Sequence, residues 1–286
     1  MLTQQIEQPV HAIVHRSRGI TGGPITRLMS PSDLGQIIKT FVFLDLAVFE
    51  DGEERTPMEY LWHPHSGIAT VTVILEGAIR FAETTGRNGV LPSGGVEWMR
   101  AGKGVWHTGQ AEEGRVRAFQ LWAALPPDLE NGPNASQYLM PDEIPVAGPA
   151  RVILGSYGGE RSPIVAPPMT YLLVSLDPGQ RWTYRRPKGH DVAWVAVHEG
   201  ALQTTSTIPT GEMAIFEPSE QPIEFVAQGK TGFVLGSATK HPHDLVLGSY
   251  SVHTSPEALR KGHEEIHRIG QELRARGALA AGRPKS

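Results

Sequence analysis

Two histidines separated by one residue are the clearest indication of a chemical function in the sequence. His63 and His65 precede an apolar run of strand length at residues 69–75. Residues two apart in an extended segment point to the same face, so both imidazoles can reach one point. A third histidine, His107, follows the glycine-rich turn at residues 101–104. Three neutral imidazoles that converge suit one divalent metal ion, with Fe, Mn, Ni, Cu and Zn all possible on these ligands.

The composition limits what else could hold a metal or attract a partner. The chain of 286 residues has no cysteine, which excludes thiolate ligands, disulfides and a thiol nucleophile. A formal net charge of −4 gives no general attraction to phosphate backbones, so we expect no direct nucleic-acid partner. The first twenty residues lack the apolar core of a signal peptide, and no stretch approaches the roughly 18 apolar residues of a membrane span. We therefore expect a cytoplasmic protein with no membrane partner.

Short β-branched runs separated by turns must position the histidines. The 32 Gly and 23 Pro lie scattered between these runs, a pattern typical of an all-β protein. A segment rich in Pro, Asn and Asp at residues 126–149 separates two strand-rich halves. The length also favours two domains, which we place at residues 1–135 and 136–286. The main expected strands are residues 40–48, 69–75, 78–83, 96–99, 116–123, 170–176, 192–197, 212–216 and 232–236.

The two halves also resemble each other. Each half contains one pair of expected strands joined by a Glu-Gly turn, at residues 76–77 and 199–200. This repeat favours an internal duplication. Aligning the two turns places Arg186 and Lys188 opposite the paired N-terminal histidines. The second half is therefore expected to hold no metal.

One helix is expected near the C-terminus. The hydroxyl of Ser255 can cap its first turn, Pro256 suits the first helical position, and Glu257 lies beside the positive end of the helix dipole. The helix should continue to about Arg276. A narrow apolar stripe predicts that it docks on a barrel through Leu259, Ile266, Ile269 and Leu273.

The stretches HPHSGIATVTVILEG and GGVEWMRAGKGVWHTG resemble the two metal motifs of the pirin family of bicupins, in order and in separation. The resemblance continues at residues 41–45, 235–237 and 250–254 and covers nearly the whole chain. It implies an all-β fold of two cupin barrels, double-stranded β-helices of jelly-roll type, packed together with a C-terminal α-helix. In that family the N-terminal cupin holds iron through three His and one Glu, which makes His63, His65 and His107 the metal ligands here.

Both carboxylates of the family's site are missing from this sequence. The family pattern His-Ser-Glu reads His107-Thr108-Gly109 here, and the acidic position of its pattern HPHRGFET is Ala69. Three neutral ligands would leave a divalent ion near +2 instead of +1, which should lower the pKa of bound water and attract anions. The simplest expectation is a three-histidine site completed by water, with iron as the first choice of metal.

Several side chains could replace the missing carboxylate. Glu97 stands where the family usually has Gln, and we take it as the candidate catalytic residue. Glu112 and Glu113 follow His107 in the next loop and could serve instead, and Gln110 could supply a neutral oxygen. A base must lie within hydrogen-bond reach of the proton that it removes, and the sequence does not settle which side chain does.

The remaining histidines and the tryptophans near the motifs have plainer explanations. His241 and His243 repeat the alternating pattern, but no strand with a Glu-Gly turn follows them, so a surface turn is expected. His190 and His198 flank an apolar strand and are interpreted as partly buried structural residues. Three tryptophans could line an apolar pocket for an aromatic ligand, although such residues usually pack inside barrels: Trp62, Trp98 and Trp106.

Three functions fit these observations. In the pirin family, which the sequence resembles, some bacterial members are similar to quercetin 2,3-dioxygenases, and animal members act as transcription co-regulators. The first hypothesis is therefore a metal-dependent dioxygenase that acts on a small aromatic or enolisable substrate. The alternative is a non-catalytic, metal-bearing regulatory module that binds a partner protein, either a transcription factor or a metabolic enzyme. The third is a cupin that has lost its metal function.

Overall fold

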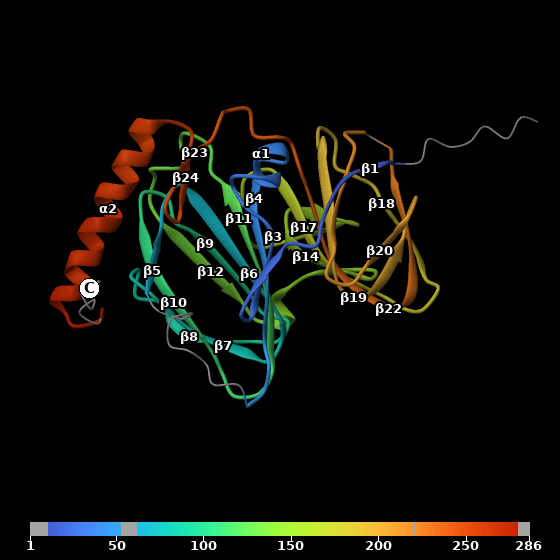
Figure 1. Ribbon diagram of the computed structural model, residues 1–286, viewed down its shortest axis with the longest axis horizontal. Coiled ribbons are helices and arrows are strands. Elements are labelled where there is room, and N and C mark those ends of the chain that lie inside the picture. Colours follow the sequence, from blue (N-terminus) through green and yellow to red (C-terminus); the bar gives the residue numbers. More distant parts are fainter. Residues whose placement is uncertain (1–10, 53–61, 220, 280–286) are drawn as a thin grey trace, which may run out of the picture. The chain divides into compact units, whose positions relative to one another are not determined.

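The computed structural model describes residues 11–52, 62–219 and 221–279. These residues form two compact units, one built from residues 11–20 with Ile144–Lys240 and the other from Thr21–Glu143 with residues 241–279 (Figure 1). Both units consist mainly of antiparallel strands. The all-β class predicted from the sequence is therefore confirmed. The domain limits of residues 1–135 and 136–286 stay a prediction.

The unit that contains the three histidines is built from two larger sheets and a small hairpin. Its described strands are antiparallel throughout. One sheet has the order β12 (Ala135–Leu139), β9 (Val96–Arg100), β6 (Ile68–Glu76), β11 (Val116–Ala124), β4 (Phe41–Phe49), β3 (Ile25–Met29) and β2 (Ile20–Gly22). The other has the order β5 (His63–His65), β10 (Val105–Ala111), β7 (Ala78–Glu83) and β8 (Asn88–Pro92). The hairpin joins β23 (Val246–Gly248) and β24 (Ser251–His253), and the unit also has the short helices α1 (Leu34–Ile37) and η2 (Pro141–Glu143).

Strand β6 is the buried centre of this unit. Seven of its residues in a row, beginning at Ile68, are buried, because β9 and β11 flank it in the sheet and side chains cover both of its faces. The turn from β5 into β6 is tight. Gly67 has a φ of 75°, and a Cβ there would lie 2.0 Å from the carbonyl oxygen of Val252. Glycine at this position therefore lets the strand that follows His65 pass directly against β24.

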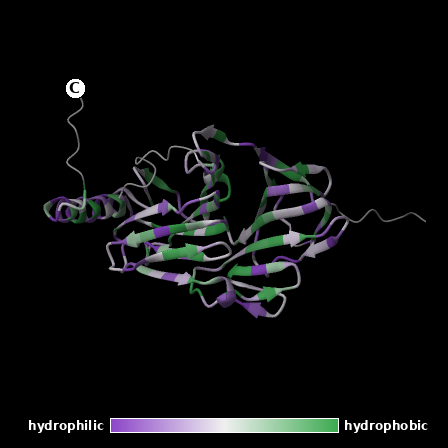
Figure 2. Ribbon diagram, turned by 90° about the horizontal axis from the view of Figure 1, so that it is seen from below, coloured by the Kyte–Doolittle hydropathy of each residue, from purple (hydrophilic) through white to green (hydrophobic). Residues whose placement is uncertain are grey.

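The other unit contains one large sheet and a small hairpin. The described order is β1 (Ile13–Ser17), β21 (Met213–Phe216), β19 (Val192–Gln203), β22 (Ile223–Ala238), β17 (Met169–Leu176), β14 (Ala150–Leu154) and β13 (Val146–Ala147). Strand β18 (Arg181–Tyr184) also pairs with β22, β20 (Thr207–Pro209) pairs with β19, and β15 (Ser156–Tyr157) pairs with β16 (Glu160–Arg161). Aromatic side chains fill its core, among them Trp182, Phe225 and Phe233. Figure 2 shows that hydrophobic residues gather on the strands of each unit.

Helix α2 spans Pro256–Ala275 and begins where the sequence predicts. The hydroxyl of Ser255 accepts a hydrogen bond from the backbone N–H of Ala258. The expected apolar stripe faces the barrel, with Ile266, Ile269 and Leu273 buried and Leu259 half-buried. No helix in the described ranges is long and apolar enough to cross a membrane.

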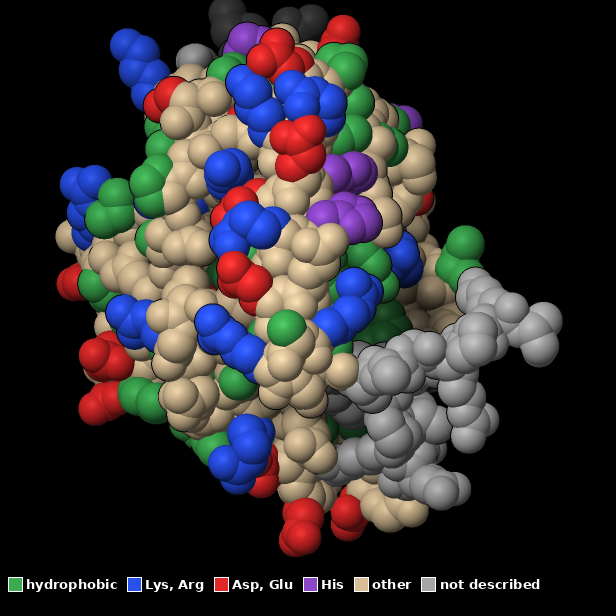
Figure 3. Space-filling view, turned by 90° about the vertical axis from the view of Figure 1, so that its left-hand side faces the viewer, with side chains coloured by type: hydrophobic (Ala, Val, Ile, Leu, Met, Phe, Trp, Pro, Cys, Tyr) green, Lys and Arg blue, Asp and Glu red, His purple; other side chains and the backbone are tan. Residues whose placement is uncertain are grey.

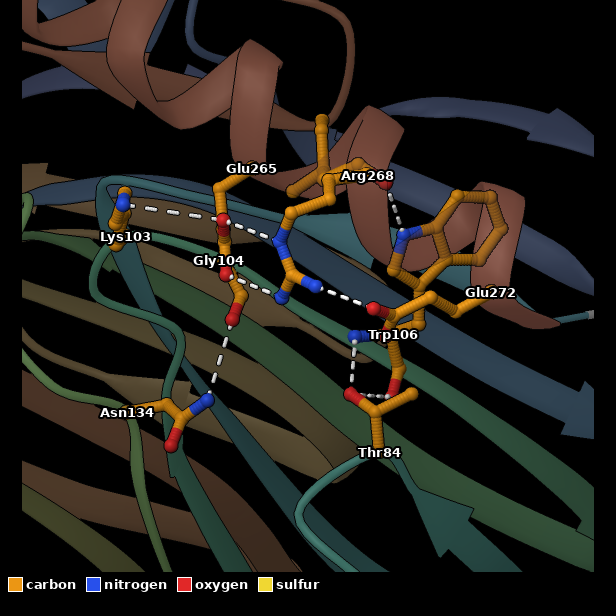
Figure 4. Close-up of polar contacts among 9 residues, drawn as sticks. Thr84, Lys103, Gly104, Trp106, Asn134, Glu265, Arg268 and Glu272 are labelled. Carbon is orange, nitrogen blue, oxygen red and sulfur yellow. Dashed lines mark hydrogen bonds and ion pairs between the residues drawn. The ribbon is translucent and has the colours of Figure 1, made fainter.

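Polar contacts also hold α2 on β10 (Figure 4). The indole N–H of Trp106 donates to the carbonyl of Ile266 at 2.7 Å, and Thr84 holds the backbone of Trp106 from the other side. Beside them, the carboxylate of Glu265 forms ion pairs with Nζ of Lys103 at 3.8 Å and with the guanidinium of Arg268 at 2.8 Å. Because the indole is tied to the helix backbone, the position of α2 and that of Trp106 depend on each other.

Gly262 is the point where α2 approaches the barrel most tightly. A Cβ there would lie 2.5 Å from the hydroxyl of Ser66 and 2.7 Å from Nε2 of His253. We expect Gly262→Ala to destabilise the protein by about 1–3 kcal/mol in urea unfolding, because overpacking outweighs the roughly 1 kcal/mol that alanine gains in helix propensity. Lys261→Ala, at the exposed neighbouring position, should change the stability by less than about 0.5 kcal/mol. A Gly262→Ala protein as stable as the natural one would contradict this packing.

Candidate metal centre

The pairing of β5 with β10 brings two of the three histidines together. The strands are antiparallel, and His63 lies directly opposite His107. Their Nε2 atoms are 2.9 Å apart. His65 points to the same side as His63, and one potential ligand atom from each of the three lies within 4.8 Å of the others. The structure thus brings together all three histidines that the sequence singled out.

His65 is held in the form that a metal requires. Its Nδ1 lies 3.1 Å from the carbonyl oxygen of Tyr250, which can only accept, so Nδ1 carries the proton and Nε2 keeps its lone pair. That Nε2 is buried and has no hydrogen-bond partner in the described chain. Burial lowers the pKa of His65 well below its ordinary value, and the nearby His107 and His63 lower it further. A neutral imidazole with a buried free lone pair fits a metal ligand.

Glu97 lies behind His107. Its Oε1 is 3.6 Å from Nδ1 of His107, and its Oε2 accepts a hydrogen bond of 2.6 Å from the hydroxyl of Thr72. Tyr138 donates a longer bond of 3.5 Å from the next strand. Burial alone would raise the pKa of Glu97, but His107 and the hydroxyl of Thr72 outweigh it, so the pKa is lowered and the carboxylate is ionised. A carboxylate at Nδ1 orients an imidazole whose Nε2 binds a metal.

The other replacement ligands that the sequence suggested lie elsewhere. Gln110 is exposed, and Glu112 pairs with Arg80 at 2.8 Å. Both are an odd number of residues from His107 on or just beyond β10, so their side chains point to the opposite face of the strand. Glu113 is also exposed.

Three residues near the histidines were not singled out from the sequence. Trp122 meets the ring of His65 edge-on, with 4.9 Å between centroids, and stacks on Phe43 at 4.0 Å. Glu83 lies on β7 opposite His107, is buried, and accepts a hydrogen bond of 2.7 Å from Ser136. Burial raises the pKa of Glu83. Tyr250 places its ring 5.8 Å from that of His63 and has an unusual φ of 58°.

The histidines at positions 190, 198, 241 and 243 lie outside this cluster. His241 is buried and bonds the carbonyl of Leu125 at 3.2 Å, while His243 is exposed. His190 bonds the hydroxyl of Ser237 at 2.8 Å, and His198 is half-buried. Within the described ranges, the cluster of His63, His65 and His107 is the one group of three or more possible ligands.

The tryptophans near the motifs differ in their surroundings. Trp98 is buried in the sheet, whereas Trp106 packs against α2. Trp62 lines a cavity beside the last turns of the same helix. Trp122, from the opposite sheet, is the tryptophan that touches a histidine of the cluster.

A buried polar network anchors the residue that follows His65. The hydroxyl of Ser66 lies 2.8 Å from that of Ser251 and 3.0 Å from Nε2 of His253. On the far side of the ring, Nδ1 of His253 is 3.5 Å from a carboxylate oxygen of Glu130. That carboxylate also accepts hydrogen bonds from the backbone N–H and the hydroxyl of Thr254. The network ties the β5–β6 turn to β24, the strand beyond Tyr250.

Two comparisons of sequence establish the family. Residues 24–123 match the family model described as Pirin. A pirin-like protein from Caulobacter vibrioides is 36% identical over 197 residues, which are 64% of this chain and 68% of that protein. The chain belongs to the pirin family. A Pseudomonas aeruginosa protein that carries a provisional name of quercetin 2,3-dioxygenase is 27% identical to this pirin-family chain over 270 residues, 89% of this chain and 93% of its own length.

Solved structures show the same fold. A quercetin 2,3-dioxygenase from Acinetobacter baumannii has a TM-score of 0.80 at 24% identity and covers 91% of this chain and 97% of its own. A bacterial pirin from Escherichia coli in complex with nickel(II) has a TM-score of 0.64 at 17% identity. The match covers 79% of this chain and 99% of the pirin. The cupin architecture expected for this pirin-family chain is therefore confirmed.

The His253 network gives the stability of the metal-free protein a pH dependence. Burial and the nearby His263 lower the pKa of His253 to about 4, below the 6.5 of an unperturbed histidine. The unfolded chain therefore binds a proton here first, and the stabilisation is complete above pH 6.5 and is lost as the pH falls toward 4. From pH 7 to pH 5, the free energy of unfolding of the natural protein should fall by about 1–2 kcal/mol relative to His253→Gln.

This measurement is made by urea unfolding in the presence of a chelator, so that metal release does not contribute. His243→Gln, which removes an exposed histidine, serves as the control and should follow the natural protein at every pH. A difference between the natural protein and His253→Gln that stays constant from pH 7 to pH 5 would contradict the account.

Proposed function

We propose that this pirin-family chain is a metal-dependent dioxygenase of the quercetinase type that acts on a small aromatic or enolisable substrate. The observation that carries the proposal is the buried, unpartnered Nε2 of His65 beside the imidazoles of His63 and His107. The Pseudomonas aeruginosa relative supports it, because its provisional name assigns it that activity. The absence of cysteine fits the cytoplasm as the proposed location.

One divalent ion would be held by His63, His65 and His107. Iron is our first choice from the family, and the solved bacterial pirin with nickel(II) supports nickel as the next; copper, manganese and zinc suit the same donor set. When bound, the ion would act as a Lewis acid for the substrate's oxygen and leave open positions beside it.

The chain's own residues would keep the ligands in place. The Tyr250 carbonyl fixes the proton of His65 on Nδ1, and Trp122 covers one edge of that ring. Glu97 was the expected catalytic residue, and its carboxylate lies on the Nδ1 side of His107. We therefore propose that Glu97 is a positioning residue for His107 and that the proton of an enolisable substrate leaves to another acceptor.

The proposed function is tested first by elemental mass spectrometry on untagged protein. Near-stoichiometric iron, nickel, copper or manganese is expected in the natural protein and in the control His243→Ala, with at least about a tenfold loss in His63→Ala and His107→Ala, since each removes one of three ligands. The loaded protein is then screened for oxygen uptake with flavonols and diketones.

Metal-free protein, or metal retained in both ligand variants, would contradict the proposed centre. Bound metal without turnover of any substrate would overturn the dioxygenase assignment. It would support the alternative function, a metal-bearing regulatory module with a protein partner.

Glu97→Gln tests the positioning role. Loss of the charge beside Nδ1 should weaken metal affinity about 10–100-fold, the usual effect of removing a carboxylate that orients a ligating histidine. Glu113→Gln removes an exposed carboxylate from the same region and should leave the affinity unchanged. Competition with a chromogenic chelator measures both. Equal affinities in the natural protein and Glu97→Gln would show that this carboxylate does not orient the ligand.

A further inference from the structure

A cavity of about 240 Å³ lies between α2 and the outer face of β5 and β10. Pro64 and Trp106, which are paired across the two strands, form its floor. Pro64 stands between His63 and His65, and successive side chains of a strand point to opposite faces. The cavity therefore lies behind the strand that carries two of the proposed ligands, and Tyr250, whose ring is 5.8 Å from that of His63, lines it.

Two aromatic side chains line this cavity. The indole of Trp106 is tied to the carbonyl of Ile266 (Figure 4). It also packs directly on Gly270, where an added Cβ would lie 2.7 Å from the ring. The second aromatic wall is Tyr250, whose backbone is held by His65. Aromatic side chains have few rotatable bonds, so they can bind a planar ring with little loss of side-chain entropy.

Arg274 of the helix supplies a positive charge to the same cavity. His263, His267, Gly270 and Arg274 recur at the spacing of one helical face and all line it. Among the residues that the structure describes, the lining contains no acidic one. Within the described chain, no hydrogen bond or ion pair engages the side chain of Arg274, whereas Arg260, Lys261 and Arg268 each pair with a glutamate of the helix. Figure 3 shows that basic, acidic and histidine side chains lie close together on the face that carries α2.

We propose that this cavity binds a small aromatic carboxylate. The ring lies between Trp106 and Tyr250, and the carboxylate meets the guanidinium of Arg274 with His267 beside it. The volume is below the roughly 300–1,000 Å³ of pockets that hold drug-sized ligands, so it suits a single ring and not a flavonol. The site does not rest on the proposed dioxygenase activity, because none of its lining residues is a proposed metal ligand.

Isothermal titration calorimetry with three probes tests the ligand class. Benzoate has both the ring and the charge, benzamide has the ring alone, and acetate has the charge alone. Benzoate should bind at least about tenfold more tightly than either, because a charge-assisted bond to arginine and the stacked ring each contribute. Benzoate that binds no better than acetate would overturn the proposal.

Matched variants locate the binding. Arg274→Gln should weaken benzoate about 10–100-fold to the level of benzamide, whereas Arg260→Gln, on the same helix but outside the cavity, should leave it unchanged. Thermal unfolding checks that both variants keep the stability of the natural protein. His107→Ala, which removes a proposed metal ligand on β10, should bind benzoate normally, whatever its metal content. Benzoate binding that is lost in His107→Ala and kept in Arg274→Gln would place the carboxylate on the metal and overturn the proposed site.

Discussion

The antiparallel register of β5 and β10 is the constraint on which the rest of the site depends. It sets His63 opposite His107, and the strand alternation then places His65 on the same face. A shift of one residue would turn these side chains to the outer face, toward α2. The same register determines which residues lie on the outer face of these strands. It pairs Pro64 with Trp106, and these two residues form the floor of the outer cavity.

The elements around the two strands hold this register in place. A backbone carbonyl of α2 accepts a hydrogen bond from the indole of Trp106. The segment before the helix places the carbonyl of Tyr250 beside His65. The Ser66–His253–Glu130 network ties the end of β5 to β24 in a region where all three side chains are buried. The C-terminal part of the chain therefore supports a centre whose proposed ligands all come from residues 63–107. Truncation of α2 would remove the support that the helix gives to the outer face of β5 and β10.

Local patterns were sufficient to predict the all-β fold and the start of α2. That His107 meets His63 and His65 was predicted from the family resemblance, because it depends on the pairing of β5 with β10, and their role as metal ligands stays a prediction. The contacts of Trp122, Glu83 and Tyr250 could not be predicted, since they depend on pairings between residues far apart in the sequence. The alternation of side chains along a strand could have excluded Gln110 and Glu112 as ligands, since both are an odd number of residues from His107 and therefore point to the opposite face. Glu97 was recognised as a nearby carboxylate, but sequence alone gives no sign of which imidazole nitrogen it faces.

Anomalous diffraction from crystals of the metal-loaded protein, collected on both sides of the metal's absorption edge, tests the central claim most directly. The account predicts one peak about 2.0–2.2 Å from an imidazole nitrogen of each of His63, His65 and His107, with waters and no carboxylate completing the ligands. A peak bound by Glu97 or Glu83, or one that lies away from any of the three histidines, would contradict it.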